Sequence, residues 1–387
     1  MPPASPPPWG DETGATLPVA LEVLRHGPLS RADVGRALGL SHASLSRLSA
    51  ALIERGILID AGERSDKRVG RPTRLLDVDA SAHRFIGIKL SESRLIAALT
   101  DLRGDVVDVR ARALDSPSPD AVVRLIAMLT ADLASDREIT AIGVGLGGAV
   151  RERRLVSSAS FLGWRDVPLA RLVEHATQTA TLVENDVIAL CRYEDWFGSG
   201  RDDDRFAVVT LGVGTGFGLV VDGTPIVSEE HGIGLVGHWP MDPAGPLCDR
   251  GHRGCAAALL NAEAISRRLG DAAGSPVPFE EALDLAAAGD PPARAIIDEA
   301  ARGLGVLLAA ICNLTLPRRI VIAGEGARIA EIGEETMRRS LASLRAAEAT
   351  TPPIVLAEEG GVEWARGAAA LAIQAFVLGE IKAPVTT

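Results

Sequence analysis

The segment from residue 206 to residue 227 constrains the fold of this chain more than any other. Residues 206–211 (FAVVTL) predict a buried strand, and residues 219–227 (LVVDGTPIV) predict a second strand soon after it. The loop between them carries Gly212, Gly214, Thr215, Gly216 and Gly218. Glycine lets backbone N–H groups approach an anion closely. A dinucleotide-binding loop would instead continue into a helix, with an acidic residue about 20 positions later. The pattern therefore predicts a β-hairpin whose loop can hold a phosphate.

The chain is long enough for two or three domains and has the composition of a globular protein. Its 387 residues are 47% hydrophobic and 24% charged. Residues 1–16 start with a Pro-rich segment that lacks the basic start and apolar run of a signal peptide, so we expect a disordered tail. The longest apolar runs are about half of the roughly 20 residues that a membrane-spanning helix needs. Four cysteines are too few for a disulfide scaffold, and we expect a cytoplasmic protein without a membrane partner.

The net charge of -11 is distributed unevenly along the chain. Residues 17–77 contain 10 Lys and Arg against 7 Asp and Glu, a net charge of +3. Residues 78–387 contain 30 against 42, a net charge of -12. A small basic module therefore precedes a large acidic one. Charge of this size is by itself only a weak indication of a polyanionic partner.

The basic module has the pattern of a helix-turn-helix. Apolar residues repeat at helical spacing over residues 17–24, and again over residues 34–38 and 45–52. Ser30 can cap the second helix, Gly39 supplies a tight turn, and Ser41 can cap the third helix. In a helix-turn-helix, the outward face of this last helix can enter the major groove of DNA. The outward-facing residues that we expect to contact bases are His42, Ser44, Ser46 and Arg47.

Two short predicted strands follow the third helix, at residues 57–59 and 75–78. The loop between them is rich in arginine and contains the sequence RVGRP. Such a loop can place guanidinium groups against phosphates or in the minor groove. We therefore predict a winged helix-turn-helix domain over residues 17–78, with Arg68 and Arg71 as DNA contacts. A helical bundle with a solvated charged loop is the alternative.

From residue 85 the chain changes to short apolar strands, glycine turns and Ala-rich helices, which is typical of an α/β fold. Several spaced motifs follow: Glu184-Asn185-Asp186, the glycine loop, Gly237-His238 with Cys248 and Cys255, and Asn313-Leu314-Thr315-Leu316-Pro317 before Ile320-Val321-Ile322-Ala323-Gly324. This order resembles the ROK family of repressors, open reading frames and sugar kinases, and the winged helix resembles its repressor branch. The resemblance implies two actin-like subdomains over residues 83–380 that close over a sugar. The small one would comprise about 83–185 plus the C-terminal helix, and the large one about 186–362.

The kinases of this family resemble one another at a first phosphate loop, Asp-x-Gly-Gly-Thr, which is not intact here. The matching stretch is residues 87–93 (GIKLSES). Its changed residues are Lys89, Ser91, Glu92 and Ser93. Phosphoryl transfer depends on positioning and charge stabilisation of the nucleotide phosphates, and the Glu92 carboxylate would face them. We therefore expect that the protein is not an enzyme and that its glycine loop is a relic.

The predicted sugar pocket is partly preserved. Its expected effector-binding residues are Ser160, Asn185, Asp186 and His238. The resemblance implies that the Asn-Asp pair binds sugar hydroxyls, with the Asp as general base in the kinases, and that the histidine touches both sugar and zinc. Ser160 stands where the family often has Asn, and Leu235 and Ala257 stand where Glu is usual. Fewer acceptors imply a different ligand, a weaker one, or none. A capped helix start is the alternative interpretation of Asn185 and Asp186.

The zinc pattern of the family resembles His-x9-Cys-x-Cys-x4-Cys and is incomplete here. His238, Cys248 and Cys255 match it, but Arg250 stands at the middle cysteine position. A structural zinc site needs four ligands, and arginine supplies none. His252 could supply the fourth ligand. The sequence therefore leaves open both a structural zinc and a metal-free loop held by packing, and no cofactor is certain.

These features predict a sequence-specific DNA-binding transcriptional regulator of the repressor type, controlled by a sugar or sugar derivative. Its expected partners are a palindromic double-stranded DNA operator and further copies of the chain, in a homodimer or homotetramer. Two alternatives stay open. One is an active ATP-dependent sugar kinase with a DNA-binding arm, and the other is a regulator with a dead pocket that a protein partner controls.

Overall fold

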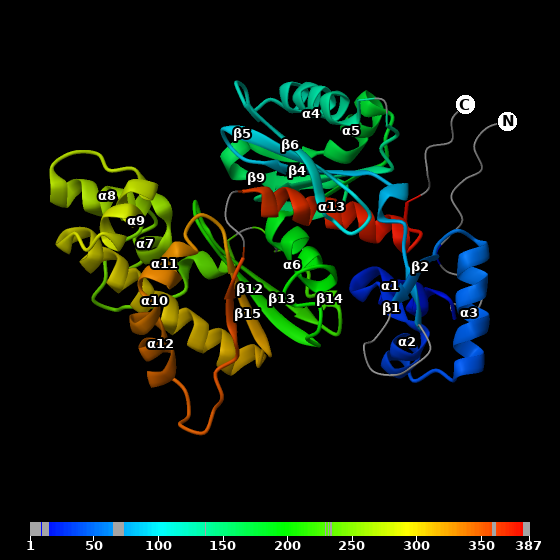
Figure 1. Ribbon diagram of the computed structural model, residues 1–387. Coiled ribbons are helices and arrows are strands. Elements are labelled where there is room, and N and C mark those ends of the chain that lie inside the picture. Colours follow the sequence, from blue (N-terminus) through cyan, green and yellow to red (C-terminus); the bar gives the residue numbers. More distant parts are fainter. Residues whose placement is uncertain are drawn as a thin grey trace.

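The structure is a computed structural model in which a small N-terminal unit lies beside a larger α/β unit (Figure 1). It describes Trp9 and residues 15–64, 73–135, 137–228, 230, 232, 234–357 and 361–381. The predicted DNA contacts Arg68 and Arg71 lie outside these residues. The larger unit is built on two five-stranded sheets, so the mixed α/β class predicted from the sequence is confirmed.

Three helices and a three-stranded sheet form the N-terminal unit. They are α1 (Leu17–His26), α2 (Arg31–Leu38) and α3 (His42–Glu54), with β1 (Leu29–Ser30), β2 (Ile59–Arg64) and β3 (Thr73–Asp77). The Ser30 side chain accepts a hydrogen bond from the N–H of Asp33, and the Ser41 side chain accepts one from the N–H of Ser44. Both predicted helix caps are therefore present. Gly39 has a φ of 64° between α2 and α3, a conformation that favours glycine.

The two strands of the wing are longer than predicted. The apolar residues alone predicted strands at residues 57–59 and 75–78. In the structure, antiparallel pairing between β2 and β3 extends to the residues Arg64 and Thr73, past a register shift after Asp60. Backbone hydrogen bonds between strands do not require buried side chains, so this extension has no signature in the apolar pattern.

The first sheet of the larger unit has the strand order β11-β7-β4-β5-β6. Its strands are β4 (Phe85–Leu90), β5 (Arg94–Thr100), β6 (Val106–Ala113), β7 (Ala141–Leu146) and β11 (Thr181–Asn185). Helices α4 (Pro119–Ala134) and α5 (Leu169–Thr177) cover one face, and α13 (Val362–Val377) covers the other (Figure 1). A small sheet of β8 (Ala149–Arg151), β9 (Leu155–Ala159) and β10 (Trp164–Val167) adjoins it.

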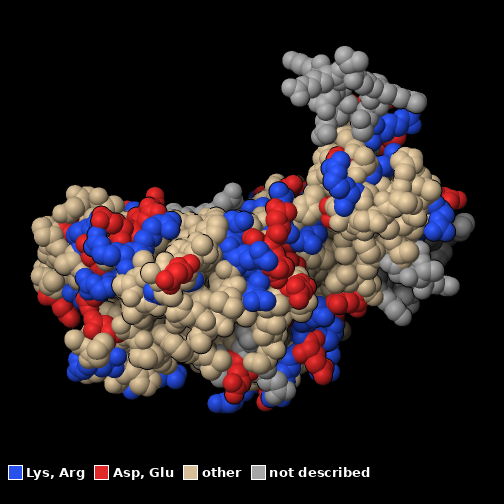
Figure 2. All heavy atoms as spheres, turned by 90° about the horizontal axis from the view of Figure 1, so that it is seen from below, with Lys and Arg blue, Asp and Glu red and all other residues tan. Residues whose placement is uncertain are grey.

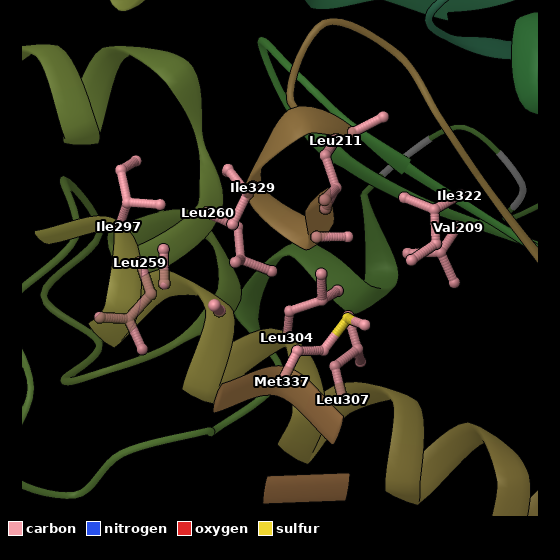
Figure 3. Packing of buried hydrophobic residues seen from close by; sticks show 14 of the residues in the cluster. Val209, Leu211, Leu259, Leu260, Ile297, Leu304, Leu307, Ile322, Ile329 and Met337 are labelled. Carbon is pink, nitrogen blue, oxygen red and sulfur yellow. The ribbon is translucent and has the colours of Figure 1, made fainter. Parts of the chain in front are cut away.

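The second sheet has the strand order β14-β13-β12-β15-β16. Its strands are β12 (Arg205–Leu211), β13 (Thr215–Val221), β14 (Thr224–Pro225), β15 (Arg319–Ala323) and β16 (Ile354–Leu356). The helices on its outer face are α7 (Ala256–Leu260), α8 (Ala262–Ala273), α9 (Phe279–Ala287), α10 (Pro291–Thr315), α11 (Arg328–Ile332) and α12 (Glu334–Ser343). Val209 and Ile322 of the strands meet Leu304 and Met337 of the helices in one core (Figure 3). No described helix is long and apolar enough to span a membrane.

Helices α6 (Asp186–Trp196) and α13 lie between the two sheets (Figure 1). Helix α13 approaches β4 and β7 so closely that a Cβ atom at Gly87 or Gly143 would overlap its backbone. Helix α6 is also closely packed, because a Cβ would meet the Cys191 sulfur at Gly218 of β13 and the backbone of α6 at Gly367 of α13. Glycine permits such close approach because it has no side chain. These contacts fix the first turn of α6 relative to both sheets.

A continuous apolar cluster joins the N-terminal unit to the larger unit. Its members include Val19, Val23 and Leu24 of α1 together with Phe85, Leu102, Trp196 and Phe376 of the larger unit. Trp9 belongs to the same cluster and is 4% exposed. This residue of the predicted disordered tail is therefore held in place, because burying an indole ring removes a large apolar surface from water.

Replacing Gly143 with Ala should lower the free energy of unfolding by about 3 kcal/mol, because the new methyl group meets the Ala368 carbonyl of α13. Urea unfolding followed by circular dichroism measures this change. Gly214→Ala is the matched control, since a Cβ there meets no atom within 4 Å. Equal free energies of unfolding for the two variants would contradict the close packing of α13.

Candidate functional site

An ion pair between Lys89 and Asp186 lies at the centre of the candidate pocket. Lys89 is on β4, Asp186 is the first residue of α6, and Lys89 Nζ donates a hydrogen bond to Asp186 Oδ2. Their side chains are only 16% and 11% exposed. The ammonium group also lies 4.6 Å from the centre of the Trp364 ring, a cation–π contact. The carboxylate predicted to bind sugar thus pairs with a cation of its own chain.

Asn185 caps helix α6. Its Oδ1 accepts hydrogen bonds from the N–H groups of Val187 and Ile188, and its Nδ2 donates to the carbonyl of Gly148. Its side chain is buried. The helix cap that the sequence left as an alternative is therefore present. These hydrogen bonds leave only one donor or acceptor position of the Asn185 amide unused.

The remaining predicted pocket residues are only partly brought together. A side chain at Gly147 would touch both the Phe161 ring and the Asp186 carboxylate, so these two groups lie beside one another. Ser160, the residue before Phe161, is exposed at the start of a short 3-10 helix. The described contacts of His238 are with Cys248, His252 and Cys255 rather than with Asp186.

The glycine loop is shorter than the sequence indicated, because β13 begins within it. Gly216 and Gly218 lie in this strand, where an added Cβ would meet the Thr210 hydroxyl of β12 and Val187 of α6 at Gly216, and Cys191 of α6 at Gly218. Close packing within the sheet and against α6 therefore explains both glycines. The Thr215 hydroxyl donates a hydrogen bond to Asn261 Oδ1 at 3.2 Å, so it is also engaged within the protein.

Two carboxylates lie near the rest of the loop. Gly212 and Gly214 stay outside the strands, but a Cβ at Gly212 would overlap the carboxylate of Glu325. Glu363, at the start of α13, is 7% exposed, and its Oε2 has no hydrogen-bond partner among the described residues. Burial raises the pKa of Glu363 to about 7, and the nearby Glu325 adds to this increase. The Glu325 carboxylate beside Gly212 would repel the phosphates of a nucleotide.

Four potential metal ligands converge at one point, and they are His238, Cys248, His252 and Cys255. Their ligand atoms all lie within 4.8 Å of one another. The Nδ1 atom of His238 is 3.7 Å from the Sγ atom of each cysteine. In a tetrahedral zinc site, bonds of about 2.0 Å to nitrogen and 2.3 Å to sulfur place such atoms about 3.5 Å apart. These residues therefore fit a zinc ion with two thiolate and two imidazole ligands.

The surroundings of the cysteines differ. Burial alone would raise the pKa of Cys248, but backbone N–H groups of Arg250 and His252 and the Cys255 thiol bring the pKa below its usual value. Burial raises the pKa of Cys255. Burial also lowers the pKa of His238, and the nearby His252 and Arg250 add to this effect. Thiolate and neutral imidazole are the forms that bind metals, so Cys248 and His238 are the better-prepared ligands.

Helix α3 presents part of the predicted DNA-reading face to solvent. His42 and Arg47 are exposed, whereas Ser44 and Ser46 are half-buried. Ser44 is less available than predicted because its N–H and its hydroxyl both bond to the capping Ser41. On the face shown in Figure 2, basic and acidic side chains are interspersed over the larger unit, so that face does not present a uniformly basic surface to DNA.

Comparison with protein families gives one match that covers most of the chain. The model described as the ROK family matches residues 85–375. The chain belongs to the ROK family. The resemblance inferred from its spaced motifs is thereby confirmed.

Relatives of this ROK protein include both kinases and regulators. Thermotoga maritima glucokinase is 31% identical over 267 residues, which are 64% of this chain and 84% of that protein. The Bacillus subtilis xylose repressor is 24% identical over 306 residues, 78% of this chain and 79% of the repressor. The Escherichia coli DNA-binding transcriptional dual regulator NagC is 26% identical over 319 residues, 78% of each chain.

Solved structures give the same two groups. A ROK family transcriptional regulator described as a homologue of E. coli Mlc superposes with a TM-score of 0.77 and 24% identity, over 94% of this chain and 96% of that one. A Streptomyces griseus ROK glucokinase with glucose and AMPPNP gives a TM-score of 0.65 and 26% identity, over 75% and 99%. The match to the regulator leaves about 23 residues of this chain uncovered. This is fewer than the N-terminal unit contains, so the match includes at least part of that unit. The predicted mixed α/β class with an actin-like fold is confirmed, and a mainly helical N-terminal unit precedes that fold.

The sequence reasoning missed the partners that surround Asp186. Lys89 was identified only as the loss of an acidic residue, and Trp364 and Glu363 were not identified at all. The ion pair joins residues 97 positions apart, so no local pattern contains it. One signal could have revealed it: a lysine in a buried strand needs a counter-ion, and Asp186 was the acidic residue already assigned to the same pocket.

We expect His252→Ala to reduce the zinc content of the purified chain from about one ion per chain to much less than one, because three ligands hold a structural zinc poorly. Inductively coupled plasma mass spectrometry measures the ratio. His175→Ala, an exposed histidine on α5, is the control and should retain the wild-type zinc content. Full zinc occupancy in His252→Ala would remove His252 from the ligand set.

Proposed function

We propose that this ROK protein is a DNA-binding transcriptional regulator of the repressor type that responds to a sugar or sugar derivative without phosphorylating it. Its similarity to the xylose repressor and to NagC over more than three quarters of the chain supports this function. Its similarity to glucokinases keeps an active kinase as the alternative. The ion pair between Lys89 and Asp186 is the observation that favours the regulator.

In a kinase of this fold, the carboxylate at position 186 would accept the proton of the attacking sugar hydroxyl. A general base needs a free oxygen within hydrogen-bond reach of that proton. Here one oxygen of Asp186 accepts from Lys89 and the other accepts from the N–H of Val187. With Glu325 beside Gly212, the nucleotide phosphates would meet negative charge instead of the stabilisation that phosphoryl transfer requires.

Sugar binding makes smaller demands than catalysis. A sugar hydroxyl can donate to Asp186 in place of the Lys89 ammonium, and this exchange of hydrogen bonds needs no proton transfer. The released ammonium can then donate to another oxygen of the ligand. The pocket can therefore sense a sugar while it lacks the means to phosphorylate one.

The N-terminal unit would carry the contacts to DNA. The exposed Arg47 of α3 can donate two hydrogen bonds to a guanine in the major groove. Arg68 and Arg71 in the sequence of the wing would bind phosphates or the minor groove. A homodimer or homotetramer would match a palindromic operator, since symmetric regulators place one recognition helix in each half-site. The second alternative is a regulator whose pocket binds no sugar and whose DNA binding is controlled by a protein partner.

A sugar that binds should raise the melting temperature of the protein, because it binds the folded state only; at 100 times Kd the gain is about 2.7 kcal/mol. D-glucose, D-xylose and N-acetylglucosamine are the first probes, since they appear in the names of the relatives. Asp186→Ala should abolish the shift, and Asp132→Ala, a half-exposed residue of α4, should retain it. A normal shift in Asp186→Ala would place the pocket elsewhere.

A coupled assay with ATP and the same sugars should show no turnover by the protein. A turnover rate of about 1 to 1000 per second would support the kinase alternative.

Arg47→Ala and Arg71→Ala should weaken DNA binding in different ways. Loss of Arg47 should reduce the preference for operator over scrambled DNA by about 1 to 3 kcal/mol, since its contacts are with bases. Loss of Arg71 should weaken both DNAs together and reduce the salt dependence by about one counterion per subunit, since its contacts are with phosphates. Fluorescence anisotropy across a salt series measures both, with Arg339→Ala on α12 as the control. Equal weakening on both DNAs by Arg47→Ala would contradict its role in reading bases.

A further inference from the structure

Two arginines join the N-terminal unit to the larger unit, and each binds the carbonyl end of a helix in the other unit. Arg103 lies in the turn between β5 and β6, and it donates to the carbonyls of Val23 and Leu24 at 3.0 and 3.1 Å. Arg25 of α1 donates to the carbonyl of Asp195, in the last turn of α6, at 2.7 Å. Carbonyls at the end of a helix carry partial negative charge and can accept further hydrogen bonds, although the Val23 carbonyl also accepts one from the N–H of Gly27. The two guanidinium groups therefore cap the two helices reciprocally.

Arg103 also fixes the wing. Its guanidinium binds both carboxylate oxygens of Asp77, the last residue of β3, besides the two carbonyls of α1. A planar guanidinium can make this set of hydrogen bonds, whereas a lysine ammonium cannot match its geometry. Gly27 leaves the necessary space, since a Cβ there would press on both the Arg103 guanidinium and the Asp77 carboxylate. One side chain of the larger unit thus holds both the first helix and the last strand of the N-terminal unit.

Arg25 is the counter-ion of a buried carboxylate. Asp195 is 3% exposed, and its Oδ1 lies 3.9 Å from the Arg25 guanidinium. Burial raises the pKa of Asp195, and Arg25 opposes this increase. Arg25 also donates to the carbonyl of Arg201 at 2.7 Å. A displacement of the end of α6 would therefore act directly on Arg25, because both the backbone and the side chain of Asp195 contact it.

The same helix begins at the pocket. Helix α6 starts with Asp186, which pairs with Lys89, and reaches Asp195 near its other end, a distance of about 14 Å at 1.5 Å per residue. Gly218 of β13 and Gly367 of α13 both pack against α6, with no room for a Cβ at either position. A closely packed helix moves as a unit rather than absorbing a local shift. The described residues thus provide a rigid link between the pocket and Arg25.

We propose that Arg25 and Arg103 form a lock that sets the orientation of the N-terminal unit, and that α6 carries the state of the Lys89–Asp186 pair to this lock. When a ligand takes Asp186 from Lys89, the first turn of α6 shifts, and its last turn changes the contact with Arg25. The orientation of α3 then changes with that of α1, because both belong to the same packed unit. The regulatory meaning of this link rests on the function proposed above.

Amide hydrogen exchange in the full-length chain tests the link without sugar or DNA, so it can fail independently of the proposed function. Lys89→Met breaks the pair at one end of α6, and Arg25→Ala breaks the lock at the other. Each substitution should accelerate exchange in residues 17–26 by about threefold or more, since the C-terminal turn of α1 loses its fixed partner. Arg338→Ala, which removes an ion pair within α12, is the control and should leave this exchange unchanged.

The double variant distinguishes a link from two separate effects. If α6 connects the two ends, Lys89→Met adds no further acceleration in the Arg25→Ala background. Unchanged exchange in α1 of Lys89→Met, or fully additive effects in the double variant, would overturn the proposal. Asp186→Asn preserves the shape of its side chain and replaces Lys89→Met if that variant does not fold. The same two criteria then apply to it.

Discussion

The close backbone contact between α13 and the first sheet is the constraint on which the rest of the larger unit depends. Gly87 and Gly143 allow this contact, and Gly367 brings α6 against the same helix. As a result, β4, α6 and α13 each supply one member of the group formed by Lys89, Asp186 and Trp364. The pocket is therefore a product of helix packing between two sheets, and its central charge pair sits where three rigid elements meet.

The charges around this pocket are the reverse of what a phosphoryl-transfer site needs. Such a site stabilises polyphosphate with donors and cations and keeps a carboxylate free as a base. Here the cation neutralises that carboxylate, while Glu325 adds negative charge beside Gly212 of the glycine loop. The actin-like fold is shared with the ROK glucokinase, so the difference lies in these charges.

Local features of the chain could be predicted from the sequence, and contacts between distant segments could not. The caps at Ser30 and Ser41 and the glycine hairpin depend on neighbouring residues, so their patterns predicted them correctly. The roles of Gly216 and Gly218 were assigned to phosphate approach, although the packing of α6 also explains them. The pair of Arg25 with Asp195 joins segments 170 positions apart, which no spacing rule anticipates. Burial and charge of the final partners decide such contacts.

A ligand can shift a conformational equilibrium only by the difference in its affinity for the two states. In this pocket that difference would come from exchanging one partner of Asp186 for another, so the intramolecular pair sets the reference against which any sugar competes. A strong pair makes the pocket selective for ligands with several well-placed hydroxyls, because one hydrogen bond alone does not replace an ion pair in a nearly dry site. Lys89 would therefore do more than remove kinase activity. It would give the protein a defined unliganded state, and a regulator needs that state as much as it needs the liganded one.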